Sequence, residues 1–148
     1  MAPDIGLGNW FRQRALRTPE RRALRFEGRD WTYADMQLEI EDCAERLAAL
    51  GVEKDNRVAF LGLNQPMFFF VMFGCARIGA IFVPLNFRLT GPELAFMIQD
   101  CAVRALIVDA QLRARQSVVA EDGPCRRGRS ALDAGAGARG RTRSRPRR

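Results

Sequence analysis

Residues 58–86 read VAFLGLN, QPMFFFVMFGCARIG and AIFVPLN in succession, and this stretch decides the fold. The run 58–63 is short and apolar and ends in the turn signal Asn-Gln-Pro, residues 67–78 have the length of a helix, and the run 80–83 is apolar again. Strand, helix and strand over about 30 residues make a βαβ unit, whose strands we expect to be parallel. Because both runs are apolar throughout, they are typical of parallel strands covered on both faces.

Three residues mark the boundaries of this unit. Pro66 suits the first helical position, because its φ is already helical and the N–H that it lacks would have no helical partner there. Gly79 is a natural end for the helix, and Pro84 is expected to end the second strand. The turn before the helix contains no glycine that would cradle a phosphate, so we interpret the unit as scaffold rather than as a nucleotide site.

A helix and a hairpin are predicted ahead of the unit. Asn9 can cap a helix over residues 10–17. The runs 23–26 and 29–32 lie on either side of a Glu-Gly pair and predict an antiparallel hairpin.

The clearest amphipathic helix is predicted over residues 33–50, with Thr32 as its cap and Asp35 at the third position. Its apolar residues recur at alternating spacings of three and four: Tyr33, Met36, Ile40, Cys43, Leu47 and Leu50. Residues 90–93 repeat the capping pattern ahead of another helix, and residues 104–108 predict a third parallel strand. The fold class is therefore α/β, a small parallel sheet with covering helices and an N-terminal β-hairpin.

The basic excess of the chain lies in its last 38 residues. The whole chain has 24 Lys and Arg against 17 Asp and Glu, whereas residues 111–148 hold 11 Arg and three acids, which leaves residues 1–110 at a net charge of −1. Residues 111–148 contain no aromatic residue and little large aliphatic side chain, so we expect them to be disordered. A nucleic-acid binder acting through residues 126–148 is the weaker alternative, because nothing aromatic there stacks on bases; no specific nucleic acid is expected. A G-x-G-x-x-G match at 135–140 lacks the strand that a dinucleotide loop needs.

Metal and disulfide chemistry are disfavoured by the cysteine pattern. Cys43, Cys75, Cys101 and Cys125 form no C-x-x-C pair, and the chain has no His. The first three lie among apolar residues and are expected to be buried free thiols. The longest uncharged apolar run, 67–76, is too short for a membrane span, and no secretory signal is seen, so a cytoplasmic protein is expected.

Several motifs in order resemble the beginning of an adenylate-forming acyl-CoA synthetase of the AMP-binding superfamily, with the bacterial fatty-acid–CoA ligases as the nearest branch. Trp-Thr-Tyr at 31–33 is similar to the opening motif of that family. The small-residue helix with Gly-Ala at 74–80, Val-Pro-Leu-Asn at 83–86 and Leu-Thr-x-x-Glu-Leu at 89–94 follow in the family's order. The likeness covers about residues 8–110 and implies an N-terminal fragment of such an enzyme.

The resemblance implies ATP-dependent joining of a fatty acid to coenzyme A, with ATP, Mg and CoA serving the full-length family. Those enzymes use a Ser/Thr/Gly-rich loop ending in Gly-x-Pro-Lys, acids for ribose and magnesium, and a late catalytic lysine. This chain has a single lysine, Lys54, in a polar link away from any Gly-rich loop. We therefore assign no catalytic, cofactor-binding or metal residue, expect no cofactor on this chain, and expect it to be inactive alone.

Two parts are predicted: a partial synthetase N-terminal domain over 1–110 and the Arg/Ala/Gly-rich tail over 111–148. A tail without family character is what out-of-frame reading of a GC-rich gene would produce, so a frameshift is our hypothesis. A non-catalytic remnant or interaction protein is the alternative to a ligase. Because the piece packs on a larger domain in the resembled enzymes, residues 67–73 are expected to stay partly uncovered, and the chain to need the rest of the domain or a partner for solubility.

Overall fold

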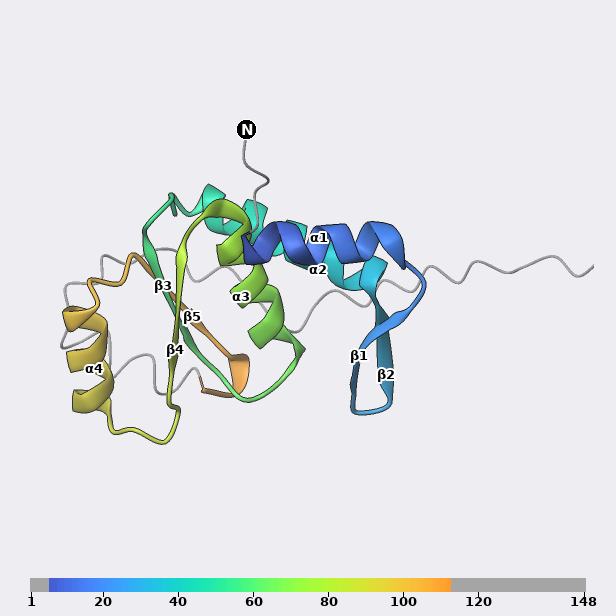
Figure 1. Ribbon diagram of the computed structural model, residues 1–148. Helices are drawn as coiled ribbons and strands as arrows, with labels where there is room; N and C mark the ends of the chain where they lie inside the picture. The colour runs from blue at the N-terminus through green and yellow to red at the C-terminus, as the bar shows by residue number, and fades with distance from the viewer. Residues whose placement is uncertain (1–5, 113–148) are drawn as a thin grey trace, which may run out of the picture.

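The computed structural model describes residues 6–112 (Figure 1), and the predictions for the tail, for Cys125 and for residues 135–140 fall outside these residues. The elements follow in the order α1 (Leu7–Arg17), β1 (Arg22–Phe26), β2 (Arg29–Thr32), α2 (Tyr33–Ala49), β3 (Arg57–Leu61), α3 (Pro66–Ile78), β4 (Ile81–Leu85), α4 (Gly91–Asp100), β5 (Ala105–Val108) and the short 3-10 helix η1 (Ala110–Leu112).

The centre of the fold is a parallel sheet in the order β4-β3-β5, and β1 and β2 form a separate antiparallel hairpin. The side chains of β3 alternate between the two faces of the sheet. Val58 and Phe60 pack with α2 and α3, whereas Ala59 and Leu61 pack with α4. Helices therefore cover both faces, as Figure 1 shows, and the predicted α/β class with its N-terminal hairpin is confirmed.

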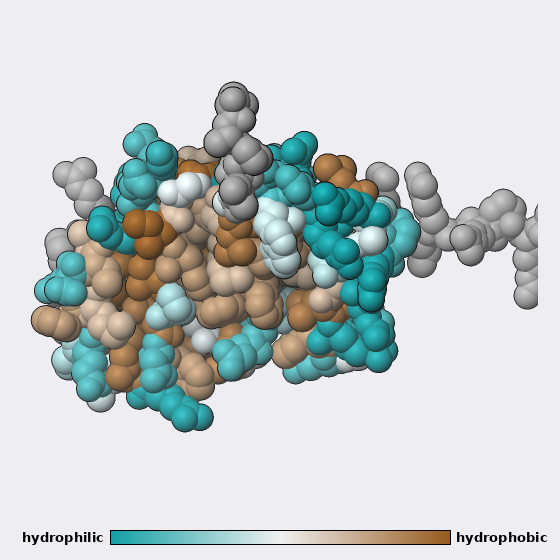
Figure 2. All heavy atoms as spheres, in the orientation of Figure 1, coloured by the Kyte–Doolittle hydropathy of each residue, from teal (hydrophilic) through white to brown (hydrophobic). Residues whose placement is uncertain are grey.

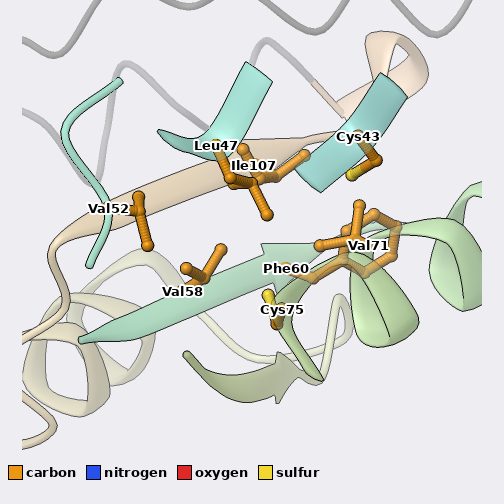
Figure 3. Packing of buried hydrophobic residues seen from close by; sticks show 8 residues of the cluster. All are labelled: Cys43, Leu47, Val52, Val58, Phe60, Val71, Cys75 and Ile107. Atoms are coloured by element: carbon orange, nitrogen blue, oxygen red, sulfur yellow. The ribbon is translucent and has the colours of Figure 1, made fainter. Parts of the chain in front are cut away.

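The main core lies between the sheet and the helices α2 and α3 (Figure 3). Its buried members come from α2, α3, the strands β3 and β5, and the link between α2 and β3: Cys43, Leu47, Val52, Val58, Phe60, Val71, Cys75 and Ile107. Every apolar residue of β3 thus contacts a covering layer, which is why this strand carries no polar side chain after Arg57.

The predicted start and end of α2 are confirmed. The Thr32 Oγ1 accepts from the Asp35 backbone N–H at 3.1 Å, and the Thr32 backbone N–H donates to the Asp35 carboxylate at 2.9 Å. These two bonds satisfy donors that a helix start leaves unpaired. The helix ends before Gly51, whose φ of 78° is the left-handed conformation that glycine adopts without strain.

The βαβ unit forms as predicted, with two shifts in its strands. Pro66 begins α3 and Gly79 ends it at φ 75°. β3 ends at Leu61 rather than at residue 63, and the prediction that Pro84 ends β4 is wrong, because the strand runs through it to Leu85. Within residues 6–112 β4 is an edge strand that pairs with β3 alone, and edge strands tolerate the N–H that proline lacks.

Coverage of the strands and of α3 is uneven. β3 is buried on both faces, whereas β4 is largely half-buried or exposed, so the expectation of two covered faces holds for β3 only. On α3, Phe70, Val71 and Phe73 are buried, and Phe69 is 39% exposed. The expected uncovered surface over residues 67–73 is therefore confined to part of the helix.

α1 begins earlier than predicted, since Leu7 is its first residue and Asn9 lies inside it. The capping residue is Gly6, and no side chain caps this end. α1 packs so closely on α3 that a Cβ added at Gly8 would lie 2.9 Å from the Ala76 carbonyl oxygen. A second core cluster forms here from the helices and the hairpin: Phe11, Trp31, Met36, Ile40, Phe70 and Phe73.

Candidate functional site

The edge of the sheet where its three strands end is the first place to look for a site, because ligands of open parallel sheets bind outside the carboxyl ends of the strands. Leu61 pairs with Leu85 of β4 and with Val108 of β5. The residues that follow these strands therefore reach the same edge: Gly62, Asn86 and Asp109.

Asp109 is the one buried charged residue among residues 6–112, with 5% of its surface exposed. Its carboxylate accepts a hydrogen bond from the Gln65 side-chain amide, and its backbone N–H donates to the Leu61 carbonyl at 2.9 Å. Gln65 is the cap residue of α3, so the contact ties the turn between β3 and α3 to the end of β5. This contact joins residues 44 positions apart and was not foreseen from the sequence.

The start of α3 is poorly suited to hold a phosphate. Pro66 at the first helical position has no N–H to offer, and the Phe68 N–H already donates to the Gln65 carbonyl at 3.0 Å. Because β3 ends at Leu61, Gly62 lies in the turn before α3, and the expectation that this turn contains no glycine was wrong. The space beside Gly62 is filled, however, since an added Cβ would overlap the Phe60 ring. The edge thus presents a carboxylate and an amide bound to each other, not an anion cradle.

Lys54 lies at the opposite end of β3 from Asp109. It precedes β3 by three residues, and its side-chain stem contacts α3 at Gly79, where an added Cβ would lie 3.0 Å from the Lys54 Cγ. The neighbouring Asp55 N–H donates to the Gly79 carbonyl at 2.9 Å, which holds this link in place. The lone lysine of the chain therefore sits at the amino edge of the sheet, away from the edge where the strands end.

The thiols are placed for packing rather than for chemistry. Cys43 and Cys75 are buried and free, and desolvation by burial raises the pKa of each thiol to about 12, with Asp42 adding to the shift at Cys43. A thiol so hard to ionise is a poor nucleophile and a poor metal ligand. Cys101 is free but only half-buried, so the expectation of burial was wrong for it.

Neither a metal centre nor a membrane span emerges from the described part of the chain. Across residues 6–112, His, Cys, Asp and Glu side chains nowhere gather in threes as a metal site would need. In the same residues no helix combines the length and the apolar character required to cross a bilayer.

A protein-family model described as AMP-binding enzyme matches residues 11–143, which is most of the chain. The chain belongs to the AMP-binding enzyme family. The resemblance drawn from the motifs at 31–33 and 74–94 is thereby confirmed. Ligases of this family use ATP, Mg and CoA in general. The carboxyl edge does not fit Mg, because the buried Asp109 carboxylate accepts a hydrogen bond from Gln65 and, within residues 6–112, no group of three acidic, Cys or His side chains could hold a metal ion.

The relatives of known activity are ligases that act on several acids. A feruloyl-CoA synthase of Amycolatopsis sp is 42% identical over 102 residues, which are 69% of this chain and 21% of that protein. An indoleacetate–CoA ligase of Aromatoleum aromaticum is 39% identical over 109 residues, covering 74% of this chain and 21% of the relative. The chain spans about a fifth of the length of these relatives.

Solved structures show the same architecture. A fatty acyl CoA synthetase of Mycobacterium tuberculosis superposes with a TM-score of 0.73 at 34% identity, over 76% of this chain and 23% of that one. The O-succinylbenzoate coenzyme A synthetase of Bacillus subtilis gives 0.67 at 34% identity, over 70% and 27%. The described fold is thus that of one part of a much longer ligase.

Proposed function

We propose that this chain supplies scaffold to an acid–CoA ligase and that its 148 residues do not carry out the ligation by themselves. The observation that carries the proposal is the position of Lys54. The only lysine in the sequence lies at the amino edge of the sheet and packs on Gly79, whereas the polar residues that follow the strands lie at the other edge. Charge on ATP must be neutralised during attack at its phosphate. Among residues 6–112 the carboxyl edge has no lysine, and the cation beside it is Arg88, whose backbone N–H donates to Asn86.

Fatty acids are the acids that we propose for the ligase. A long-chain-fatty-acid–CoA ligase of Mycobacterium tuberculosis is 38% identical over 106 residues and supports this class, beside the relatives at 42% and 39% identity that are named for feruloyl-CoA and indoleacetate. None of the described residues is assigned to the acid, since the apolar side chains of β3 and most of those of α3 pack in the core.

We further propose that residues 1–110 form the ligase part and that residues 111–148 arise from a shifted reading frame. Alignments of 102 and 109 residues with two relatives support this division of the chain. The match of the family model up to residue 143 counts against it. The downstream DNA decides this point: a second frame after codon 110 that encodes the Gly-rich loop supports the frameshift, and its absence refutes it.

A chimera tests the scaffold proposal. Residues 8–110 replace the matching segment of the Mycobacterium tuberculosis fatty acyl CoA synthetase, and acyl-CoA formation is measured with fatty and aromatic acids. We expect a folded chimera that keeps the acid preference of the recipient, because the transferred residues build the sheet rather than the acid site. A soluble chimera without activity, or one whose acid preference changes, would contradict the scaffold role. A parallel transfer of Lys54→Ala is the matched control and should behave like the unaltered chimera.

A further inference from the structure

Four apolar side chains of α3 and β4 form one continuous surface beside the main core. The Phe68 ring lies 5.7 Å from the Phe69 ring and 5.1 Å from the Phe82 ring, measured between centroids. Pro84 follows Phe82 by two positions and so lies on the same side of β4. Phe69 is 39% exposed, Pro84 is exposed, and Phe68 and Phe82 are half-buried. Together these four residues make up the α3–β4 face.

This face has almost no charge around it. α3 and β4 carry a single charged residue, Arg77, which lies in the last turn of α3, whereas α2 alone carries five acids. Figure 2 shows hydrophobic side chains gathered over β4 and α3 on the side in view. Within residues 6–112 β4 is also an edge strand, and natural sheets commonly protect such strands with charged residues, of which β4 has none. An apolar surface of this kind marks a site of association with another protein.

The remaining residues of this chain do not match the α3–β4 face. Residues 113–148 contain 11 Arg, no aromatic residue and only three large aliphatic ones, Val118, Val119 and Leu132. A second copy is disfavoured, because each chain carries a net charge of +7 and two copies repel each other. The solved structures indicate a different occupant. The superposed fold takes up 23% of the Mycobacterium tuberculosis fatty acyl CoA synthetase, so about three quarters of that protein lies outside it.

We propose that the α3–β4 face binds a separate polypeptide that carries the remaining part of an acid–CoA ligase. This role rests on the proposed scaffold function and adds that the scaffold joins the ligase as a second chain. Burial of the exposed parts of Phe69 and Pro84 against an apolar partner surface supplies the free energy. Residues 58–76 and 78–87 carry no charge that would have to be stripped of water, so the contact should depend little on salt.

Co-expression tests this binding. The full 148-residue chain is produced together with the Mycobacterium tuberculosis fatty acyl CoA synthetase from which the matching segment has been removed and to which an affinity tag has been added. We expect the tagged protein to retain the chain in equal amounts. Retention should persist at about 0.5 M salt, where attraction by the Arg-rich residues 113–148 is screened within a few ångströms.

Two matched variants separate the α3–β4 face from other apolar surface. Phe69→Gln should lower the amount of retained chain about three- to tenfold, because the exposed part of this side chain would no longer be buried in the partner. Phe96→Gln removes a side chain that is 68% exposed on α4, which covers the other side of the sheet, and should leave retention unchanged. Far-UV circular dichroism of each variant alone checks that it keeps the fold.

Three results would overturn the proposal. The first is a tagged protein that does not retain the chain, whether it is soluble or not. The second is an equal loss of retention in Phe69→Gln and Phe96→Gln. The third is a dimer of the 148-residue chain in sedimentation that Phe69→Gln dissociates, which would assign the face to a second copy. An active chimera without retention would refute this binding alone, whereas an inactive chimera would strike the scaffold function itself.

Discussion

Truncation of Leu47 should remove a large share of the stability of the described domain. Leu47 comes from the middle of α2, has no exposed surface and points into the core between this helix and the sheet (Figure 3). Leu47→Ala deletes three carbon atoms, which at about 0.8 kcal/mol each amounts to about 2.4 kcal/mol of lost transfer free energy. The cavity left behind adds to this, so we expect a loss of about 3–4 kcal/mol against a total of about 5–15 kcal/mol for a domain.

Leu38→Ala is the matched control, because it makes the same substitution in the same helix at a side chain that is 67% exposed. Helix propensity changes equally in both variants and cancels. Urea unfolding followed by circular dichroism gives the free energy of unfolding of each, and the control should lie within about 0.5 kcal/mol of the unaltered chain. Equal losses in the two variants would refute the packing of α2 on the sheet, and so would a chain that unfolds without a cooperative transition.

Three further predictions concern the thiols, the end of α3 and the carboxyl edge. The folded state keeps the protons of Cys43 and Cys75 up to a pKa of about 12, while unfolded thiols ionise near 9, so the free energy of unfolding should fall as pH rises from about 9 to about 12. Cys75→Ala should flatten this slope in urea titrations, and an unchanged slope would contradict the burial of this thiol. Gly79→Ala places a side chain at φ 75° and should cost about 1–2 kcal/mol of unfolding free energy by thermal denaturation, and a gain in stability would show that the helix does not end there. Asp109→Ala removes the acceptor of the Gln65 amide and should cost about 1–3 kcal/mol in the same assay, whereas no loss would mean that the bond does not stabilise the fold in solution.

The elements that the sequence predicted well are those whose causes are local. The start of α2 depends on Thr32 and Asp35, three positions apart, and its buried face depends on a spacing that any helix imposes. Pro66 and Gly79 act through their own backbone, so the bounds of α3 could be read without knowledge of the rest of the fold.

The features that the sequence did not predict are the course of β4 through Pro84, which depends on a partner strand far along the chain, and the start of α1. Pro84 reads as a strand end unless it is known that β4 lies at an edge of the sheet, where its missing N–H costs no ladder bond. The early start of α1 has no capping side chain to signal it.

The contacts of the candidate site also depend on residues that lie far apart in the chain. The burial of Asp109 and its bond to Gln65 arise only when β3 and β5 pair, although one signal was available in a polar residue at the end of each predicted parallel strand.

We propose that the chain has the fold of one part of an AMP-binding family ligase and lacks the groups that activate an acid. ATP–pyrophosphate exchange measured on the 148-residue chain with fatty and aromatic acids tests it most directly, with the Amycolatopsis feruloyl-CoA synthase as the positive control. We predict no exchange above a blank without protein. Exchange that requires an acid and rises in proportion to the chain concentration would contradict the claim, and its loss in Lys54→Ala would show that the lone lysine takes part.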